Sequence, residues 1–198
     1  MTGSKNATRW MLDVTAGPSG YVAVGGSRDG KGNHPSVWVS PDGKQWTLRV
    51  LELPASGVTE GHLTHVAAKG NTLVAAGIAA TQRGLDWLGY VSTDAGRTWR
   101  PLESPSGETQ ATITALTATP KGFAATGTTG RAGATDVVSW TSADGASWQA
   151  AAPGGTGLGG VGDQQITGLS VFGDSLLGVG RSADSRGGQP VLWSRPVP

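Results

Sequence analysis

The apolar and polar positions of this chain follow a pattern that recurs four times. Each recurrence begins with a segment of alternating apolar and polar residues, then passes through a turn into a short run of small apolar residues. The alternating segments read MLDVTAG, LTHVAAKG, ITALTATP and ITGLSVFG. Alternation with a period of two is typical of β-strands that bury one face. The pattern therefore predicts many short strands and no long helices.

Two further markers keep the same spacing along the chain. The small apolar runs end in glycines that lie about 50 residues apart, namely Gly25, Gly77, Gly127 and Gly180. An aromatic residue follows each run at an equivalent place, namely Trp38, Tyr90, Trp140 and Trp193. Repeat periods of about 40 to 50 residues are typical of propeller blades. We therefore expect one all-β domain over residues 1–198, with four-stranded units at about 10–53, 62–104, 112–152 and 165–198, the last incomplete.

A turn motif closes each of the first three units. Its copies are SPDGKQW (40–46), STDAGRTW (92–99) and SADGASW (142–148). They share a serine, an aspartate, a glycine and a tryptophan in that order: Ser40, Asp42, Gly43 and Trp46; Ser92, Asp94, Gly96 and Trp99; Ser142, Asp144, Gly145 and Trp148. The fourth unit has no such copy.

These turns resemble the Asp-box, or BNR, repeat of sialidases, sortilin-type receptors, xyloglucan-cleaving glycosidases and a photosystem assembly factor. The resemblance implies a β-propeller with four Asp-box type blades. It also implies a structural role for the boxes, in which the aspartate accepts hydrogen bonds from the backbone of the turn and the tryptophan packs between blades. We assign no catalytic or metal-binding role to these carboxylates, because a calcium loop needs several oxygen ligands at close spacing.

Closure of the ring is an open question at this point. The fourth unit reaches Pro196-Val197-Pro198 after its third strand, and proline removes a donor from a strand ladder. The short polar segment from Thr2 to Arg9 is a poor substitute for the missing strand. The sequence favours a segment of a larger propeller, or a half that pairs with another chain, over a four-bladed ring. Missing blades or a homo-oligomer would then complete the ring.

Composition excludes several classes of function. Fifteen basic and fourteen acidic residues give a net charge of +1, so we expect no nucleic-acid partner. The absence of cysteine excludes disulfides and thiolate metal sites, and no segment is apolar over the length needed for membrane insertion. We predict no cofactor and no metal. We also expect a bacterial protein that works outside the cell or on its surface, with its export signal absent from this sequence.

The loops opposite the boxes are the predicted binding surface, which is where the resemblance places ligands. Each of four loops contains an arginine with an acidic residue nearby. The candidate ligand-binding residues are Arg28, Arg83, Asp86, Trp87, Arg131, Arg181 and Asp184. Together with Arg186, these arginines could grip a carboxylate or sugar acid. The alternative is that they pair with Asp29, Asp86, Asp136 or Asp184 on a solvated rim, and that Trp87 caps a blade junction.

Two functional hypotheses follow. The first is a non-enzymatic binding or scaffolding propeller that presents its loops to a glycan, a peptide or a protein. The second is a fragment of an Asp-box glycoside hydrolase, sialidase-like or xyloglucanase-like, in which Glu60, Glu108 and Asp163 would supply paired carboxylates. Both tyrosines lie in strands, which disfavours a sialidase nucleophile. His62 and His65 are too few for a metal site, so we name no catalytic residue and regard an enzyme as the less favoured interpretation.

Overall fold

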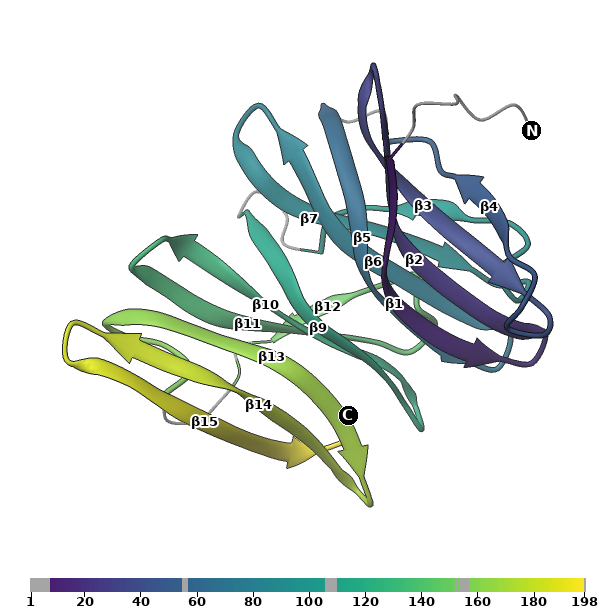
Figure 1. Ribbon diagram of the computed structural model, residues 1–198. Coiled ribbons are helices and arrows are strands. Elements are labelled where there is room, and N and C mark those ends of the chain that lie inside the picture. The colour runs from purple at the N-terminus through teal and green to yellow at the C-terminus, as the bar shows by residue number, and fades with distance from the viewer. Residues whose placement is uncertain (1–7, 55–56, 106–109, 152, 154–156, 198) are drawn as a thin grey trace. The chain divides into compact units, whose positions relative to one another are not determined.

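The computed structural model describes residues 8–54, 57–105, 110–151, 153 and 157–197, which fold entirely into strands, turns and connecting segments (Figure 1). The chain divides into two compact units, residues 1–104 and 105–198. The described residues include no helix long and apolar enough to cross a membrane. Whether residues 1–198 act as one domain therefore stays a prediction, and each unit is described by itself.

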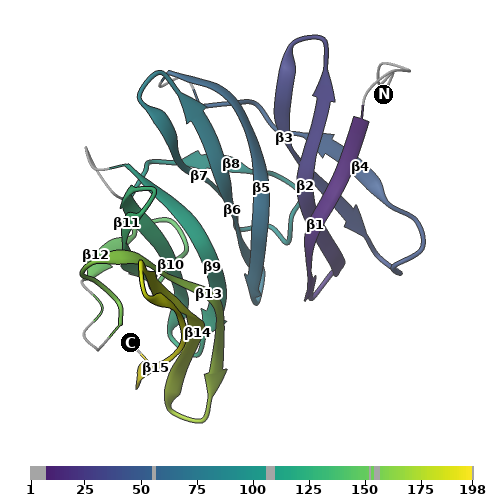
Figure 2. The same ribbon diagram turned by 60° about the vertical axis from the view of Figure 1, so that its left-hand side comes forward.

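Unit 1 contains two antiparallel meanders of four strands. Repeat 1 consists of β1 (Thr8–Gly17), β2 (Gly20–Asp29), β3 (Gly32–Ser40) and β4 (Thr47–Val50). Repeat 2 consists of β5 (Val58–Lys69), β6 (Thr72–Thr81), β7 (Gly84–Ser92) and β8 (Arg100–Leu102). Each strand pairs with the next one in sequence, so β1 and β4 are the edges of the first sheet (Figure 2).

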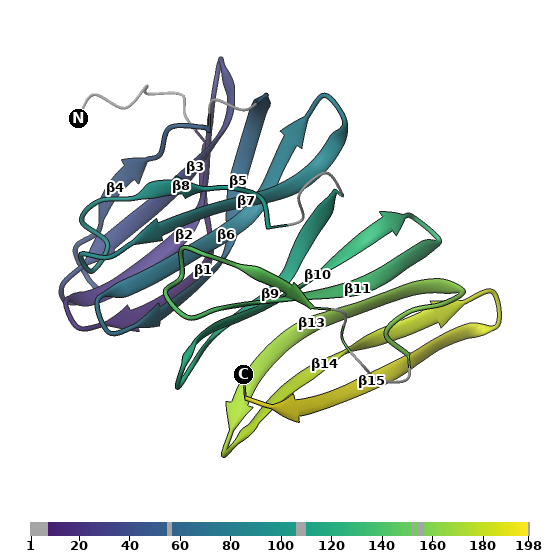
Figure 3. The same cartoon turned by 180° about the vertical axis from the view of Figure 1, so that it is seen from behind.

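Unit 2 contains a third and a fourth meander. Repeat 3 consists of β9 (Ala111–Thr119), β10 (Gly122–Arg131), β11 (Ala134–Ser142) and β12 (Gln149–Ala151). Repeat 4 has three described strands, β13 (Gly162–Phe172), β14 (Ser175–Asp184) and β15 (Gly187–Pro196) (Figure 3). A short parallel pairing of Ala134 and Thr135 with Gly162 and Asp163 joins the two meanders into one sheet.

A β-bulge interrupts the first strand of every repeat at the same place. The pairing shifts between Met11 and Asp13 on β1 and between Leu63 and His65 on β5. Equivalent shifts occur where β9 pairs with Thr126 and Gly127 of β10, and between Ile166 and Gly168 on β13. A bulge inserts one extra residue, here in the first strand of the repeat, and increases the local twist.

The bulges explain why glycine recurs at the end of each small apolar run. A Cβ atom added to Gly25 would collide with the carbonyl oxygen of Trp10, and one added to Gly77 would collide with that of His62. Gly127 and Gly180 face the carbonyl oxygens of Thr112 and Gln165 in the same way. Close approach of two backbones at the bulge leaves no room for a side chain, so only glycine fits there.

Each unit has its own apolar core between its two meanders. In unit 1 the core contains Val24, Val37, Leu63 and Leu88, all with at most 1% of their surface exposed. Asp13 of β1 links the two meanders of this unit, because its Oδ2 accepts a hydrogen bond from Val66 N at 2.8 Å. In unit 2 the core includes Ile166 and Trp193.

The second and third strands of each repeat are longer than the sequence suggested. The predicted binding loop that contains Arg28, expected at 27–36, is mostly strand, since β2 extends to Asp29 and β3 begins at Gly32. Gly32 and Gly84 have φ values of +119° and +125°, which is the conformation that such tight turns require. The predicted binding loops are therefore the ends of long hairpins.

Candidate functional site

The box turns are held by networks of hydrogen bonds that converge on one serine and one aspartate. Ser92 Oγ accepts a hydrogen bond from Gly96 N at 2.9 Å and donates to Asp94 Oδ1 at 2.8 Å. Asp94 Oδ1 also accepts from Thr98 N at 2.8 Å, and its Oδ2 accepts from Thr98 Oγ1 at 2.6 Å. Trp99 Nε1 donates to Gly96 O at 3.2 Å. The turn is thus closed on itself by its own side chains.

The two shorter boxes follow the same scheme. Asp42 Oδ1 accepts from Lys44 N and Gln45 N at 2.8 and 2.9 Å. Asp144 Oδ1 accepts from Ala146 N and Ser147 N, both at 2.8 Å. These donors stabilise the ionised carboxylates and lower the pKa of both groups. For Asp94, the hydrogen bonds from the Thr98 hydroxyl and backbone lower the pKa to about 2.

The four predicted arginines lie on exposed parts of the hairpins. Arg28 on β2 and Arg83 in the turn after β6 belong to unit 1. Arg131 at the end of β10 and Arg181 on β14 belong to unit 2. All four side chains are solvent-exposed. Their grouping into a ring stays a prediction.

The predicted aromatic platform is not in a loop. Trp87 lies within β7 and is 4% exposed, and the neighbouring Asp86 is 8% exposed. Asp86 Oδ1 accepts a hydrogen bond from Trp87 N at 2.8 Å. The expectation of an accessible loop tryptophan was wrong because β6 and β7 continue almost to the hairpin turn. This tryptophan serves the packing of repeat 2.

Acidic residues near the hairpin ends bind local partners. Asp184 pairs with Arg186, with 2.7 Å between Oδ2 and Nη2, which matches the alternative of a solvated ion pair. Asp29 Oδ1 lies 3.2 Å from His34 Nε2 and accepts a hydrogen bond from Lys31 N. These contacts lower the pKa of both carboxyl groups. Asp136 Oδ1 accepts from Gly160 N.

The described carboxylates that were considered for hydrolysis also accept hydrogen bonds from nearby groups. Glu60 Oε2 accepts a hydrogen bond from Asn33 N at 3.2 Å, and Asp163 Oδ1 accepts from Gly133 N at 2.9 Å and from Thr135 Oγ1 at 2.9 Å. Glu108 lies outside the described residues. Across the described ranges, no three or more His, Asp or Glu side chains are grouped so that they could hold a metal.

The two neighbouring histidines have structural surroundings. His65 Nδ1 lies 2.7 Å from the Thr64 hydroxyl, and the His62 ring packs edge-on against Trp10 with 6.1 Å between centroids. Burial lowers the pKa of His62. Both lie on the bulged part of β5. They therefore contribute to packing at the bulge.

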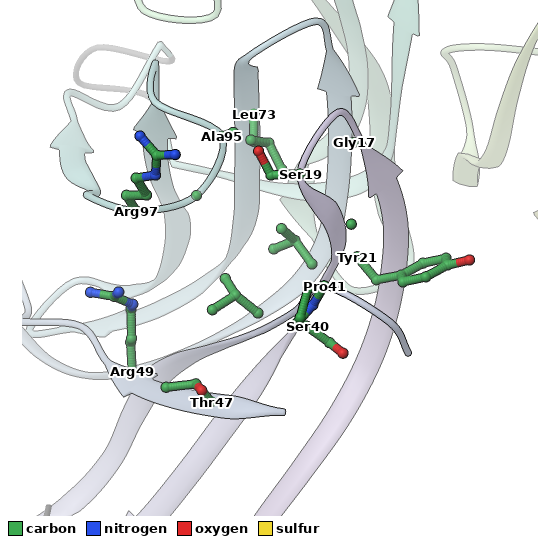
Figure 4. A pocket seen from close by; sticks show the side chains of 14 residues that line it. Gly17, Ser19, Tyr21, Ser40, Pro41, Thr47, Arg49, Leu73, Ala95 and Arg97 are labelled. Carbon is green, nitrogen blue, oxygen red and sulfur yellow. The ribbon is translucent and has the colours of Figure 1, made fainter. Parts of the chain in front are cut away.

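Sequence reasoning missed a pocket in unit 1, on the side where the boxes lie. A cavity of about 190 Å³ is bounded by Val22 and Val39 of repeat 1, by Leu73 at the start of β6 and by the box turn of repeat 2 (Figure 4). Arg49 from β4 and Arg97 from the box turn also line it (Figure 4). The floor is apolar, and the cations belong to separate meanders.

Arg49 extends a row of core residues. Val24 pairs with Val37, and Val37 pairs with Arg49 across neighbouring strands. Residues paired in this way project from the same face of a sheet, so Arg49 faces repeat 2 as the two valines do. Its Nε atom is buried and has no hydrogen-bond partner among the described residues. A buried N–H of a charged group without an acceptor is costly, and an anionic ligand would satisfy it.

A larger groove shares part of this lining. It has a volume of about 1080 Å³ and runs over β4, Leu51 and the Arg97–Trp99 segment. Thr47, Arg49 and Arg97 line both the pocket and the groove. Arg9 adds a third cation, and no Asp or Glu is among the described residues that line either space. We call the pocket and the groove together the β4 site.

Two sequence features are connected with this site. Arg49 occupies a position on β4 that faces a core, where the alternation of the strand would ordinarily place an apolar residue. Arg97 follows the glycine of the one box that has the longer spacing. Neither feature stands out without knowledge of which strands face each other.

Comparison with known proteins identifies the fold and leaves the activity open. No family model and no curated protein matches the chain. Two solved structures of a GH32 β-fructofuranosidase from Bombyx mori are similar, one of them a mutant in complex with sucrose. The mutant has a TM-score of 0.51 at 11% identity, and the other a TM-score of 0.50 at 12% identity.

The alignments cover 96% of this chain and 47% of those enzymes, so the chain spans about half their length. The likeness, together with the antiparallel meanders, defines an all-β fold of the β-propeller kind. At this level of identity it says nothing about chemistry.

Proposed function

We propose that this chain is a non-enzymatic binding or scaffolding β-propeller of the Asp-box type, with repeats 1 to 4 as its blades. The ligand is a glycan, a peptide or a protein surface. One observation carries the proposal: within the described part of the chain, the carboxylates considered for hydrolysis accept hydrogen bonds from backbone N–H groups. Glu60 accepts one from Asn33 N, and Asp163 accepts one from Gly133 N. A glycosidase instead needs two carboxyl groups facing one bond in a cleft.

The β4 site supports binding without chemistry. It offers three arginines, Arg9, Arg49 and Arg97, beside an apolar surface, and the described residues that line it include no carboxylate or histidine and no tyrosine other than Tyr21. Such a surface can orient an anionic or amphipathic ligand, but it has no group suited to general acid or base catalysis. We therefore place the binding surface in unit 1, on the side of the box turns.

A glycoside hydrolase fragment is the second candidate. The similarity to β-fructofuranosidases favours it, since those enzymes share the fold. In that case the chain would need carboxylates from beyond the described residues, and Glu108 is one candidate.

A hydrolysis assay distinguishes the two. The protein is incubated with sucrose, sialyllactose and xyloglucan oligosaccharides, and released sugar is measured together with ligand retention on an array of glycans and peptides. We expect retention of a ligand without release of any product. Release of sugar at a rate above that of a heat-unfolded sample would instead support the hydrolase and refute the proposal.

A further inference from the structure

We propose that the β4 site binds an extended peptide, which adds as a fifth strand to the free edge of β4 and places an acidic side chain between Arg49 and Arg97. This inference rests on the proposed binding function and specifies its ligand class. It depends on three features of unit 1: the open edge, the apolar pocket beside it and the two arginines.

The open edge comes from the strand order. Among the described strands, β4 pairs only with β3, from Thr47 to Val50, and so forms an edge of the sheet of repeat 1. In an antiparallel pair, alternate residues direct their N–H and C=O groups away from the partner strand. These groups can pair with an incoming extended chain, which is the usual basis of strand addition. The groove along β4 gives that chain room.

The pocket accepts an apolar side chain. Val22, Val39 and Leu73 form its floor, and its volume of about 190 Å³ is enough for an aliphatic group. Thr47 and Arg49 on β4 form one wall, so a residue of a strand paired with β4 can reach the cavity. The apolar floor disfavours a strongly hydrated occupant.

The arginines select an acidic neighbour. Arg49 and Arg97 line the pocket from opposite meanders, and the lining residues that the structure describes include no acid that would neutralise them. The buried Nε of Arg49 has no acceptor among the described residues. Because side chains on one face of a strand are two residues apart, the acidic residue should follow or precede the apolar one by two positions.

A peptide is favoured over an anionic sugar by the backbone of β4. A sugar acid could satisfy the two guanidinium groups, but it offers no row of alternating donors and acceptors to match a strand edge. A peptide uses all three features at once. An anionic glycan is therefore an outcome of the test and not the proposal.

The test measures binding of the full chain to fluorescent peptides. The probe is acetyl-Thr-Leu-Thr-Asp-Thr-Leu-Thr-amide, whose apolar and acidic residues alternate on one face in either direction. A second probe replaces Asp by Asn, and a third carries N-methyl groups on all seven residues, which block pairing with a strand edge in either strand direction. Fluorescence anisotropy gives the affinities. Oligogalacturonate serves as the anionic sugar.

We expect the Asp probe to bind wild-type protein. The Asn probe should bind about tenfold more weakly, as should the Asp probe with Arg49→Gln or Arg97→Gln, because each change removes one charge-assisted contact. The N-methylated probe should not bind. Lys121→Gln, which removes an exposed charge in unit 2, should leave binding unchanged. Arg97 is exposed, so its variant keeps the test valid if Arg49→Gln fails to fold.

Several results would overturn the inference. Equal affinity of the Asp and Asn probes would remove the role of the arginines, and binding of the N-methylated probe would remove strand addition. Arginine-dependent binding of oligogalacturonate without peptide binding would make the ligand a glycan and leave the proposed function standing. Absence of all binding here overturns the inference alone, because the proposed function is judged by the hydrolysis and array experiment.

Discussion

At the scale of single residues, the marker glycines are the positions where backbone geometry most strictly limits the side chain. We expect Gly77→Ala to lower the free energy of unfolding by about 3 kcal/mol, since its methyl group would overlap the His62 carbonyl and force the bulge apart. Urea denaturation checks this value. Gly30→Ala is the matched control, because a Cβ there meets nothing within 4 Å. If both variants lower the free energy of unfolding equally, the collision at the bulge is not the cause.

The longer box contains the opposite situation, a non-glycine residue in a conformation that favours glycine. Ala95 has a φ of 59°, and its N–H donates to Asn71 O at 2.9 Å. The left-handed region costs a residue with a Cβ about 1 kcal/mol. Ala95→Gly should therefore raise the free energy of unfolding by about that amount, measured by urea titration. A decrease would show that packing of the methyl group outweighs the backbone strain.

The box carboxylates should make the free energy of unfolding depend on pH in the acidic range. The pKa of Asp94 lies near 2 in the folded chain against an ordinary 3.8, so its stabilising effect is complete above about pH 4 and disappears as the pH falls towards 2. Asp94→Asn should be less stable than wild type at pH 7. The difference should shrink between pH 4 and 2, as urea midpoints at several pH values will show. A difference that is constant with pH would contradict this assignment, and Asp174→Asn, an exposed change, serves as control.

At the scale of elements, the hydrogen bond between β1 and β5 is one of the polar contacts between repeat 1 and repeat 2. Asp13→Ala leaves the N–H of the buried Val66 without its acceptor and should cost about 1–3 kcal/mol. Thermal or urea unfolding measures the loss, with Asp174→Ala as the exposed control. If the two variants are equally stable, the hydrogen bond contributes nothing to the contact between the meanders.

The elements also show how far sequence reasoning reached. The alternating segments, the turns and the boxes predicted the antiparallel meanders, because each depends on local spacing. The bulges escaped notice, since the shift between Leu63 and His65 alters pairing without altering the alternation visible in the sequence. The hairpins were predicted too short because polar residues such as Ser27, in reality 6% exposed, resemble loop residues in sequence.

The candidate site could not be predicted for a related reason. Arg49 and Arg97 are 48 positions apart, and only the packing of repeat 1 on repeat 2 brings them to one pocket. The arginines chosen from the sequence were those in polar, glycine-rich stretches, where exposure is evident without a fold. A cation facing a core row is visible only once the register of β3 and β4 is known.

At the scale of the whole molecule, apolar side chains remain exposed on the last meander. Val179 and Leu192 are paired across β14 and β15, and 77% of the surface of Leu192 is exposed. Exposed apolar strand faces promote association. We expect light scattering to give a mass above the 20.0 kDa of one chain, and Leu192→Lys to reduce it. A wild-type protein that stays at monomer mass at all concentrations would contradict the expectation of an oligomer.

The pairing of a bulge with a glycine has a consequence for how such a chain can grow or shrink. Both partners lie in the same hairpin, so every repeat sets the alignment of its first two strands from its own sequence, as Leu63 and Gly77 do in repeat 2. A duplicated or transplanted repeat would carry its alignment with it. Such a chain should therefore lengthen or shorten by whole repeats. An insertion of one or two residues between the bulge and its glycine would disrupt only the hairpin that contains it.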